Sequence, residues 1–137
     1  MTERIAITLG DPAAIGPDIC VMMAKSFITK KHIILTDPQL LLDSSKKLNI
    51  KININNLKTL SAKTVSGDNV LNVYPIKLHV KNRPGYMNEK NSSFVIETIK
   101  TAVKGCIDGT FDAMVTGPIS KSILNKGGYK ISGHTEF

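Results

Sequence analysis

Short apolar segments alternate along this 137-residue chain with longer segments whose apolar residues repeat at helical spacing. The short segments are rich in β-branched residues, as strands are, and they cover residues 4–9, 32–36, 70–80 and 111–115. Strands separated by helices pair in parallel and carry the helices on the faces of their sheet. The sequence therefore predicts one α/β domain with a largely parallel sheet and flanking helices.

Proline residues indicate where two of the helices begin. Pro17 and Pro38 suit the first helical position, where a missing N–H loses no partner, and Asp37 is a residue type that caps helices. The longest helix is predicted at residues 88–106. After Pro17 the apolar residues that fall at helical spacing predict one buried stripe, made of Cys20, Met23, Ala24 and Phe27.

The middle of the chain is its least regular part. Residues 49–69 are rich in Asn and Lys and predict a surface excursion with one weak strand at residues 50–54. Pro75 lies inside the strand that follows, which indicates a sheet edge or a bulge. Asn91 or Ser92 is expected to cap the longest helix.

The chain is basic, but its charges are spread out. Eighteen Lys and Arg residues against eleven Asp and Glu give a formal net charge of +7, and only Arg4 and Arg83 are arginines. Nucleic-acid surfaces gather Arg and Lys on one face among stacking aromatic residues, so we expect no nucleic-acid partner. No apolar run approaches the roughly 18 residues that cross a bilayer, and the N-terminus does not read as a secretory signal. We expect no membrane association and a cytoplasmic location.

The two cysteines and two of the three histidines give no sign of a metal site. Cys20 and Cys106 each fall on the apolar side of a predicted helix, where cysteine acts as a small hydrophobe. Their spacing indicates neither a disulfide framework nor a metal clip. His32 begins a predicted strand, and His79 is a polar position on an alternating strand, so an ordinary structural role is favoured for both.

Residues 10–17, GDPAAIGP, form an unusually constrained loop after the first strand, with two glycines and two prolines in eight residues. The loop lies where open α/β sheets bind ligands, at the carboxyl end of a strand. Its glycines do not match the dinucleotide fingerprint, and no Walker lysine follows them. Asp11 can bind a ligand hydroxyl or cap the turn, and the local pattern favours the cap.

The last 27 residues, 111–137, hold a second candidate loop and a polar cluster. Gly117 ends the strand, Pro118 suits the first position of a helix, and Lys121 follows one turn later. A helix N-terminus with a lysine can bind an anion such as phosphate, although a plain connecting loop explains the same residues. His134, Thr135 and Glu136 then bring a titratable ring, a hydroxyl and a carboxylate together after a glycine, as a chemical site or as an exposed polar turn.

Taken together, ITLGDPAAIGPD (residues 7–18) and AMVTGPISKSILNKGGYKISGHTEF (residues 113–137) resemble the two hallmark segments of the 4-hydroxythreonine-4-phosphate dehydrogenase family of vitamin B6 biosynthesis. The resemblance implies NAD- or NADP-dependent oxidation of 4-phosphooxy-L-threonine with loss of carbon dioxide, which gives 3-amino-2-oxopropyl phosphate. It also implies a divalent metal (Zn, Mg or Co), a cytoplasmic homodimer and two α/β domains like those of the isocitrate and isopropylmalate dehydrogenases, with the active site between them.

The resemblance assigns roles to individual residues. His134 and Thr135 match the family's substrate-contacting His-Thr pair, while Asp11, Thr116, Gly117 and Lys121 match segments that line the same cleft. One position departs from the family pattern. Ala14 replaces a glycine, and if that glycine has a positive φ, alanine there adds strain of about 1 kcal/mol.

The family's members are well over twice as long as 137 residues. The resemblance therefore predicts that residues 1–137 are a partial N-terminal α/β domain, that the metal ligands and much of the cofactor site belong to the remaining length, and that this chain alone is inactive. Two alternatives stay open. The chain can be a truncated remnant that acts as a binding or interaction module, or the enzyme can oxidise a related four-carbon acid phosphate such as threonate or erythronate 4-phosphate.

Overall fold

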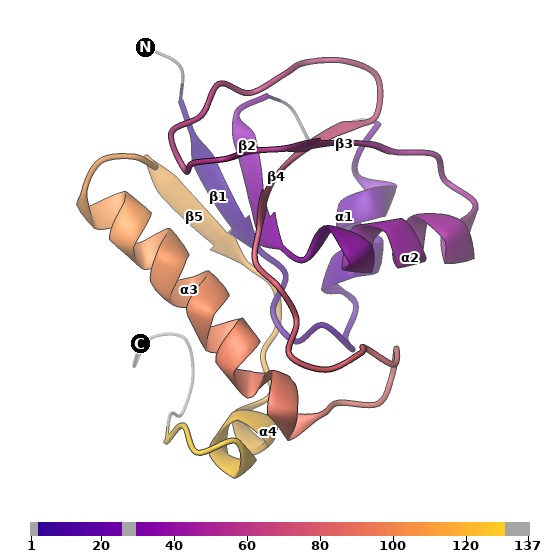
Figure 1. Ribbon diagram of the computed structural model, residues 1–137, viewed down its shortest axis with the longest axis vertical. Helices are drawn as coiled ribbons and strands as arrows, with labels where there is room; N and C mark the ends of the chain where they lie inside the picture. The colour runs from indigo at the N-terminus through magenta and orange to yellow at the C-terminus, as the bar shows by residue number, and fades with distance from the viewer. Residues whose placement is uncertain (1–2, 26–29, 131–137) are drawn as a thin grey trace.

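The computed structural model describes residues 3–25 and 30–130. The elements alternate as the sequence predicts, with strands followed by helices (Figure 1). In chain order they are β1 (Ile5–Thr8), α1 (Gly16–Met22), β2 (His32–Thr36), α2 (Pro38–Leu48), β3 (Asn53–Asn56), β4 (Val70–Pro75), the short 3-10 helix η1 (Glu89–Asn91), α3 (Ser92–Ile107), β5 (Ala113–Thr116) and α4 (Lys121–Lys126).

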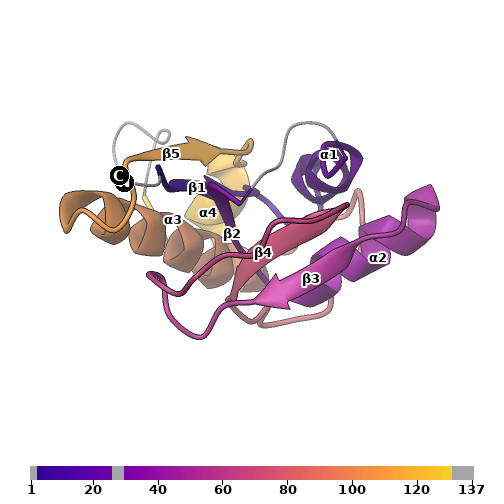
Figure 2. The same ribbon diagram turned by 90° about the horizontal axis from the view of Figure 1, so that it is seen from above.

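The five strands form one sheet in the order β3-β4-β2-β1-β5, and every neighbouring pair is parallel. Figure 2 shows the helices on both sides of this sheet, with α1 and α2 on one side and α3 on the other. The predicted α/β fold with a largely parallel sheet and flanking helices is confirmed. None of the helices described is long and apolar enough to cross a membrane.

The central strand β2 shows why the sheet needs helices on both faces. Ile33 and Leu35 belong to the hydrophobic core on the α3 side, whereas Ile34 between them belongs to the core on the α1 side, and all three are fully buried. Successive side chains of a strand point to opposite faces, so consecutive apolar residues in a strand require apolar cover on both faces. The sequence HIILT therefore fixes β2 inside the sheet.

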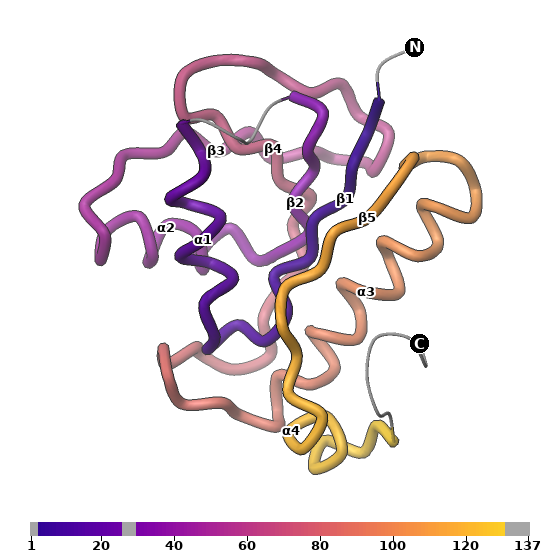
Figure 3. The backbone as a smooth tube through the Cα atoms, turned by 180° about the vertical axis from the view of Figure 1, so that it is seen from behind, coloured from indigo at the N-terminus to yellow at the C-terminus, as the bar shows by residue number. Residues whose placement is uncertain are grey.

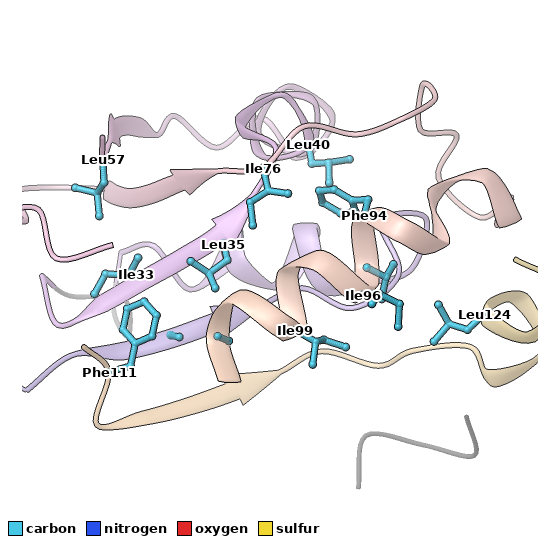
Figure 4. Close-up of a cluster of buried hydrophobic side chains, with 13 residues drawn as sticks. Ile33, Leu35, Leu40, Leu57, Ile76, Phe94, Ile96, Ile99, Phe111 and Leu124 are labelled. Atoms are coloured by element: carbon cyan, nitrogen blue, oxygen red, sulfur yellow. The ribbon is translucent and has the colours of Figure 1, made fainter. Parts of the chain in front are cut away.

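The core on the α3 side is built around aromatic and aliphatic side chains that meet between α3 and the sheet (Figure 4). Phe111, just before β5, is 2% exposed and lies against Gly105 of α3. A Cβ on Gly105 would come within 2.3 Å of the Phe111 ring, so the helix needs glycine at that position to lie this close to the sheet.

Two expectations for the middle of the chain are wrong. The strand at residues 70–80 ends at Pro75, and β4 is an internal strand between β3 and β2 rather than an edge. Proline is tolerated because it is the last strand residue, and the backbone N–H of Ile76 resumes bonding to Thr36 at 3.0 Å. Residues 53–56 form the edge strand β3, a little later in sequence than the weak strand predicted at residues 50–54.

The helix boundaries also differ in part from the prediction. Helix α1 ends at Met22, Met23 is half-buried, and Phe27 of the predicted stripe lies outside the described residues. The predicted helix at residues 88–106 is divided into η1 and α3. Asn91 occupies the N-cap position of α3, but its side chain caps nothing there. Asp37 does cap α2, by accepting the backbone N–H of Gln39 at 3.0 Å.

Strand β5 is less buried than its apolar sequence indicates. It forms the edge of the sheet beside β1, and Val115 on its α1-side face is 56% exposed. Met114 faces the opposite way and packs against the core on the α3 side. An apolar run alone does not distinguish an internal strand from an edge strand of this kind.

The Phe111–Gly105 contact gives a test of the fold. We expect Phe111→Ala to lower the free energy of unfolding by about 3–5 kcal/mol, because a large buried ring leaves a cavity. Urea unfolding followed by circular dichroism measures the change. Ile107→Ala is the matched control, since Ile107 is 82% exposed and its loss is expected to matter by no more than about 0.5 kcal/mol. Equal effects of the two substitutions would contradict the packing described.

Candidate functional site

The loops that follow β1 and β5 meet at the carboxyl edge of the sheet. After β1 the chain forms α1 on one face of the sheet and then enters β2, which is one neighbour of β1. The other neighbour of β1 is β5, which follows α3 on the opposite face of the sheet. The strand order therefore reverses between β1 and β5. Open α/β sheets bind their ligands in the crevice at such a switch point.

The two loops touch through their backbones, and Figure 3 shows the two chain segments running side by side. The Asp11 N–H donates to the Pro118 carbonyl at 3.0 Å, and the Gly117 N–H donates to the Thr8 carbonyl at 2.8 Å. Gly10 has a φ of +76°, and a Cβ there would lie 2.1 Å from the Pro118 oxygen. A Cβ on Gly117 would lie 2.3 Å from the Leu9 oxygen. Only glycine permits this approach at either position.

The rest of the first loop is held as firmly. A Cβ on Gly16 would lie 2.0 Å from the Leu9 oxygen, so the start of α1 folds back against the end of β1. The Gly85 N–H donates to the Ala13 carbonyl at 2.8 Å, which connects the turn before η1 to the first loop. Ala14 does not have a positive φ, so the strain considered for alanine at this position does not arise.

Asp11 performs the capping role that the sequence favours. Its side chain is inside the loop, 5% exposed, and its Oδ1 accepts the Ala13 N–H at 2.9 Å. Burial raises the pKa of this carboxyl group above its ordinary value, and the Ala13 hydrogen bond opposes that rise. A buried carboxyl with a displaced pKa in a crevice is a feature of functional sites, although structural loops show it too.

The sequence analysis did not single out Thr8, the last residue of β1. Its hydroxyl is buried without a hydrogen-bond partner, and the Thr36 hydroxyl at the end of β2 is in the same state. Buried hydroxyls are normally paired, because an unpaired one costs about 1–3 kcal/mol. Threonine in a strand is otherwise unremarkable, so only the three-dimensional structure reveals these two positions.

The last helix does not begin where the sequence predicts. Helix α4 begins at Lys121 rather than at Pro118, and Ser120 is its N-cap, accepting the Ile123 N–H at 3.3 Å. The helix has only six residues, and Lys121 is its exposed first residue instead of standing one turn along. Ser120, which the sequence analysis passed over, is the residue that sets this boundary.

The remaining predicted site residues divide between two parts of the chain. Thr116 and Gly117 are half-buried at the end of β5, next to the loop that holds Asp11. His134 and Thr135 lie outside the described residues. The structure therefore brings Asp11, Thr116 and Gly117 together. The substrate contacts expected of His134 and Thr135 stay predictions.

An apolar hollow of about 240 Å³ lies beside the switch point on the α1 side. It is lined mainly by apolar residues of β1, α1 and β5, and also by Thr116, Gly117 and Pro118. Cys20 lines the hollow, and burial raises the pKa of its thiol to about 12. The thiol therefore stays protonated at neutral pH, as a packing group rather than a nucleophile or metal ligand.

The described part of the chain contains no group of three His, Cys, Asp or Glu side chains placed to hold a metal ion. His32 and His79 belong to different regions, at the start of β2 and after β4. The residues present in residues 3–25 and 30–130 do not fit a divalent metal, and we assign no metal ligand among them.

Fold and loops define the class of this protein: an open α/β protein whose parallel sheet offers a ligand crevice at its switch point. Comparison with known proteins identifies the family within that class. Residues 28–137 match the family model described as "Pyridoxal phosphate biosynthetic protein PdxA", and the chain belongs to this family.

Curated relatives agree with the family model. The chain is 42% identical over 133 residues to 4-hydroxythreonine-4-phosphate dehydrogenase of Saccharophagus degradans, a match that covers 97% of this chain and 39% of the relative. For the same enzyme of Yersinia enterocolitica the identity is 37%, covering 98% of this chain and 41% of the relative. The chain thus spans about two fifths of the length of these relatives.

Solved structures give the same result. The crystal structure of 4-hydroxythreonine-4-phosphate dehydrogenase from Klebsiella pneumoniae superposes with a TM-score of 0.87 at 26% identity, over 98% of this chain and 42% of that one. A terephthalate 1,2-cis-dihydrodiol dehydrogenase from Burkholderia xenovorans shares the fold, with a TM-score of 0.72 at 16% identity over 93% of this chain and 37% of that one. The family resemblance found in the sequence is confirmed.

The contact between the two loops predicts a glycine requirement. We expect Gly117→Ala to lower the free energy of unfolding by about 1–3 kcal/mol, because its Cβ would meet backbone atoms that cannot rotate away. It should also speed hydrogen exchange of the Asp11 amide, which bonds to Pro118. Gly67→Ala is the control, since its Cβ would meet only a Val70 side-chain atom, at 3.0 Å. Unchanged Asp11 exchange in Gly117→Ala would contradict the contact.

Asp11 predicts a pH dependence of stability. Its pKa in the folded chain is raised above the ordinary value of 3.8, so the folded state holds this proton more tightly than the unfolded state. The stability that Asp11 contributes therefore falls as pH rises from about 3.8 through the raised pKa. Urea unfolding of wild type and Asp11→Asn between about pH 4 and pH 7 should show the wild type losing stability relative to the variant. A difference that does not change with pH would refute the assignment.

Proposed function

We propose that this chain supplies the switch-point side of the active site of a 4-hydroxythreonine-4-phosphate dehydrogenase. The proposed reaction is the oxidation of 4-phosphooxy-L-threonine with decarboxylation to 3-amino-2-oxopropyl phosphate, in pyridoxal phosphate biosynthesis. The observation that carries the proposal is the meeting of the two loops after β1 and β5 at one crevice, in a chain whose relatives bear this enzyme's name.

The chemistry of the substrate explains why oxidation and decarboxylation occur together. Oxidation of the secondary alcohol removes a hydride from carbon and a proton from oxygen and leaves a ketone two carbons from the carboxylate. The electron pair of the breaking C–CO₂ bond then moves onto the ketone oxygen as an enolate, which takes up a proton. NAD or NADP, when bound, accepts the hydride.

Within this proposal the residues of the chain bind and orient the substrate. His134 and Thr135 are proposed to contact it, and Asp11, Thr116 and Gly117 to line the crevice. Lys121 is proposed as a lining residue through its side chain and not through a helix terminus, since α4 begins at Lys121 itself. No step is assigned to a metal, because the described residues do not fit one.

The wider organisation is also proposed from the family resemblance. Residues 1–137 are taken as a part of the N-terminal α/β domain of a two-domain dehydrogenase that acts as a cytoplasmic homodimer. In support, the chain covers 42% of the Klebsiella enzyme while aligning over 98% of its own length.

A chimera tests the function directly. Residues 1–137 replace the matched segment of the Klebsiella enzyme, and reduction of NAD or NADP is followed with 4-phosphooxy-L-threonine, or with threonate or erythronate 4-phosphate as competitors. We expect turnover of 4-phosphooxy-L-threonine by the chimera and none by the 137-residue chain alone. A folded chimera that oxidises only one of the competitors would replace the proposed substrate.

The same chimera tests the two substrate contacts. We expect His134→Ala and Thr135→Val each to lower kcat/KM by roughly tenfold to hundredfold, the value of a hydrogen bond to a charged group. Lys126→Ala, at the exposed end of α4, is the control and should leave kcat/KM unchanged. If Thr135→Val behaves like the control, Thr135 does not contact the substrate.

A further inference from the structure

Asn91 is a buried polar residue whose side chain bonds to a loop and not to its own helix. It lies at the N-terminus of α3 and is 3% exposed. Its Oδ1 accepts the backbone N–H groups of His79 and Val80 at 3.2 and 3.0 Å, and its Nδ2 donates to the Val80 carbonyl at 3.2 Å. His79 belongs to this loop and not to a strand, contrary to the sequence prediction. A buried amide that is paired through both its oxygen and its nitrogen holds the loop in one position.

This loop is part of a longer connection, residues 76–85, which we call the strap. The strap begins at the end of β2, where the Ile76 N–H donates to the Thr36 carbonyl at 3.0 Å. The Leu78 N–H then donates to Asp37 Oδ2 at 3.0 Å, so the residue that caps α2 also fixes the strap. Figures 1 and 3 show the chain after β4 passing beside the loop after β1 before it reaches α3. The strap therefore leads from the end of β4 to the candidate site.

The far end of the strap is bonded to the first loop, residues 10–17. The Gly85 N–H donates to the Ala13 carbonyl at 2.8 Å. Gly85 has a φ of +84°, which glycine adopts without strain. The turn around it is closed by the Tyr86 N–H, which donates to the Arg83 carbonyl at 2.9 Å, and by the Arg83 guanidinium, which lies 4.5 Å from the centre of the Tyr86 ring. A closed turn thus presents the Gly85 N–H to the first loop.

Ala13 connects the strap to Asp11. The Ala13 carbonyl accepts from the strap, and the Ala13 N–H donates to Asp11 Oδ1 at 2.9 Å. On the other side of the first loop, the Asp11 N–H donates to the Pro118 carbonyl at 3.0 Å. The first loop is therefore fixed between the strap and the turn after β5, and the Asp11 carboxyl group is bonded to the residue that the strap holds.

The strap and the first loop also face each other across a narrow gap. Asn82 and Pro84 of the strap line a space of about 50 Å³ that Pro12 and Ala14 of the first loop line as well. A displacement of the strap therefore changes the packing of the first loop in addition to the Gly85 hydrogen bond.

Asn72 shows the same bonding arrangement away from the site. It is fully buried in β4, its Oδ1 accepts the Val65 N–H at 2.9 Å, and its Nδ2 donates to the Val65 carbonyl at 2.9 Å. Its Oδ1 also accepts from Asn55 Nδ2 at 2.9 Å. Asn72 is in register with Ile33 near the start of β2, whereas the candidate site lies where the strands end. The two asparagines differ in whether the loop that they hold reaches the site.

We propose that Asn91 is a positioning residue of the proposed active site and acts through the strap and Ala13 on the loop that holds Asp11. This inference rests on the proposed function, in which that loop lines the substrate crevice. Without the Asn91 amide, the N–H groups of residues 79 and 80 lose their partner, and the strap is free to move away from Ala13. A displacement of about 1 Å in an active site can lower the rate roughly hundredfold.

Hydrogen exchange of the 137-residue chain tests the coupling without any turnover. We expect Asn91→Ala to speed exchange of the Gly85 and Ala13 amides roughly tenfold to hundredfold, because the strap loses buried hydrogen bonds. Asn72→Ala is the matched control and should speed exchange of the Val65 amide instead. Equal acceleration at Gly85 and Ala13 in both variants, or in neither, would overturn the proposal.

A second variant covers the case in which Asn91→Ala does not fold. Asn91→Asp keeps the shape of the side chain and still accepts the N–H groups of residues 79 and 80, but it no longer donates to the Val80 carbonyl. We expect it to speed exchange of the Gly85 and Ala13 amides by roughly tenfold or less. Wild-type exchange rates at both amides would contradict the proposed coupling.

Kinetics of the chimera separate this proposal from the proposed function. We expect Asn91→Ala to lower kcat roughly tenfold to hundredfold with KM little changed, and Asn72→Ala to leave both constants unchanged. If the chimera turns over and the two variants behave alike, the function stands and Asn91 is not a positioning residue. If the chimera does not turn over but Asn91→Ala still speeds exchange of the Ala13 amide, the coupling stands and the proposed function falls.

Discussion

The close backbone contact between the loops after β1 and β5 is the constraint on which the rest of the site depends. Gly10 and Gly117 bring carbonyl and N–H groups of two distant segments within hydrogen-bonding distance, and the Cβ of any other residue would prevent it. Because these segments leave adjacent parallel strands, the contact also fixes how the first loop turns into α1. A rigid crevice follows from backbone geometry, before any side chain adds chemistry.

The sheet and its helices could be predicted from the sequence because burial leaves a periodic signature. The middle of β2, Ile33 to Leu35, is entirely apolar and buried on both faces, and the Asp37–Pro38 pair starts α2 where local chemistry favours it. The capping role of Asp11 was equally local and was predicted correctly. The position of the candidate site, however, depends on the contact between Gly10 and Pro118, and no local sequence pattern predicts that contact.

The errors in prediction share one cause, which is competition between local signals and packing. Pro75 signals an edge, but at the last position of a strand it loses no ladder bond and β4 remains internal. Pro118 signals a helix start, yet its carbonyl accepts the backbone N–H of Asp11, and α4 begins only after its N-cap residue Ser120. Asn91 signals a cap, but its amide is committed to residues 79 and 80. In each case a tertiary partner decides what the residue does.

The exposed edge of β5 has a consequence for the behaviour of the chain in solution. In the part of the chain that the structure describes, β5 pairs only with β1, so its outer N–H and C=O groups and the Val115 side chain are open to another molecule. Unpaired strand edges template association between molecules, and the net charge of +7 opposes it by mutual repulsion. Added salt screens that repulsion, so we expect any association through this edge to increase with ionic strength.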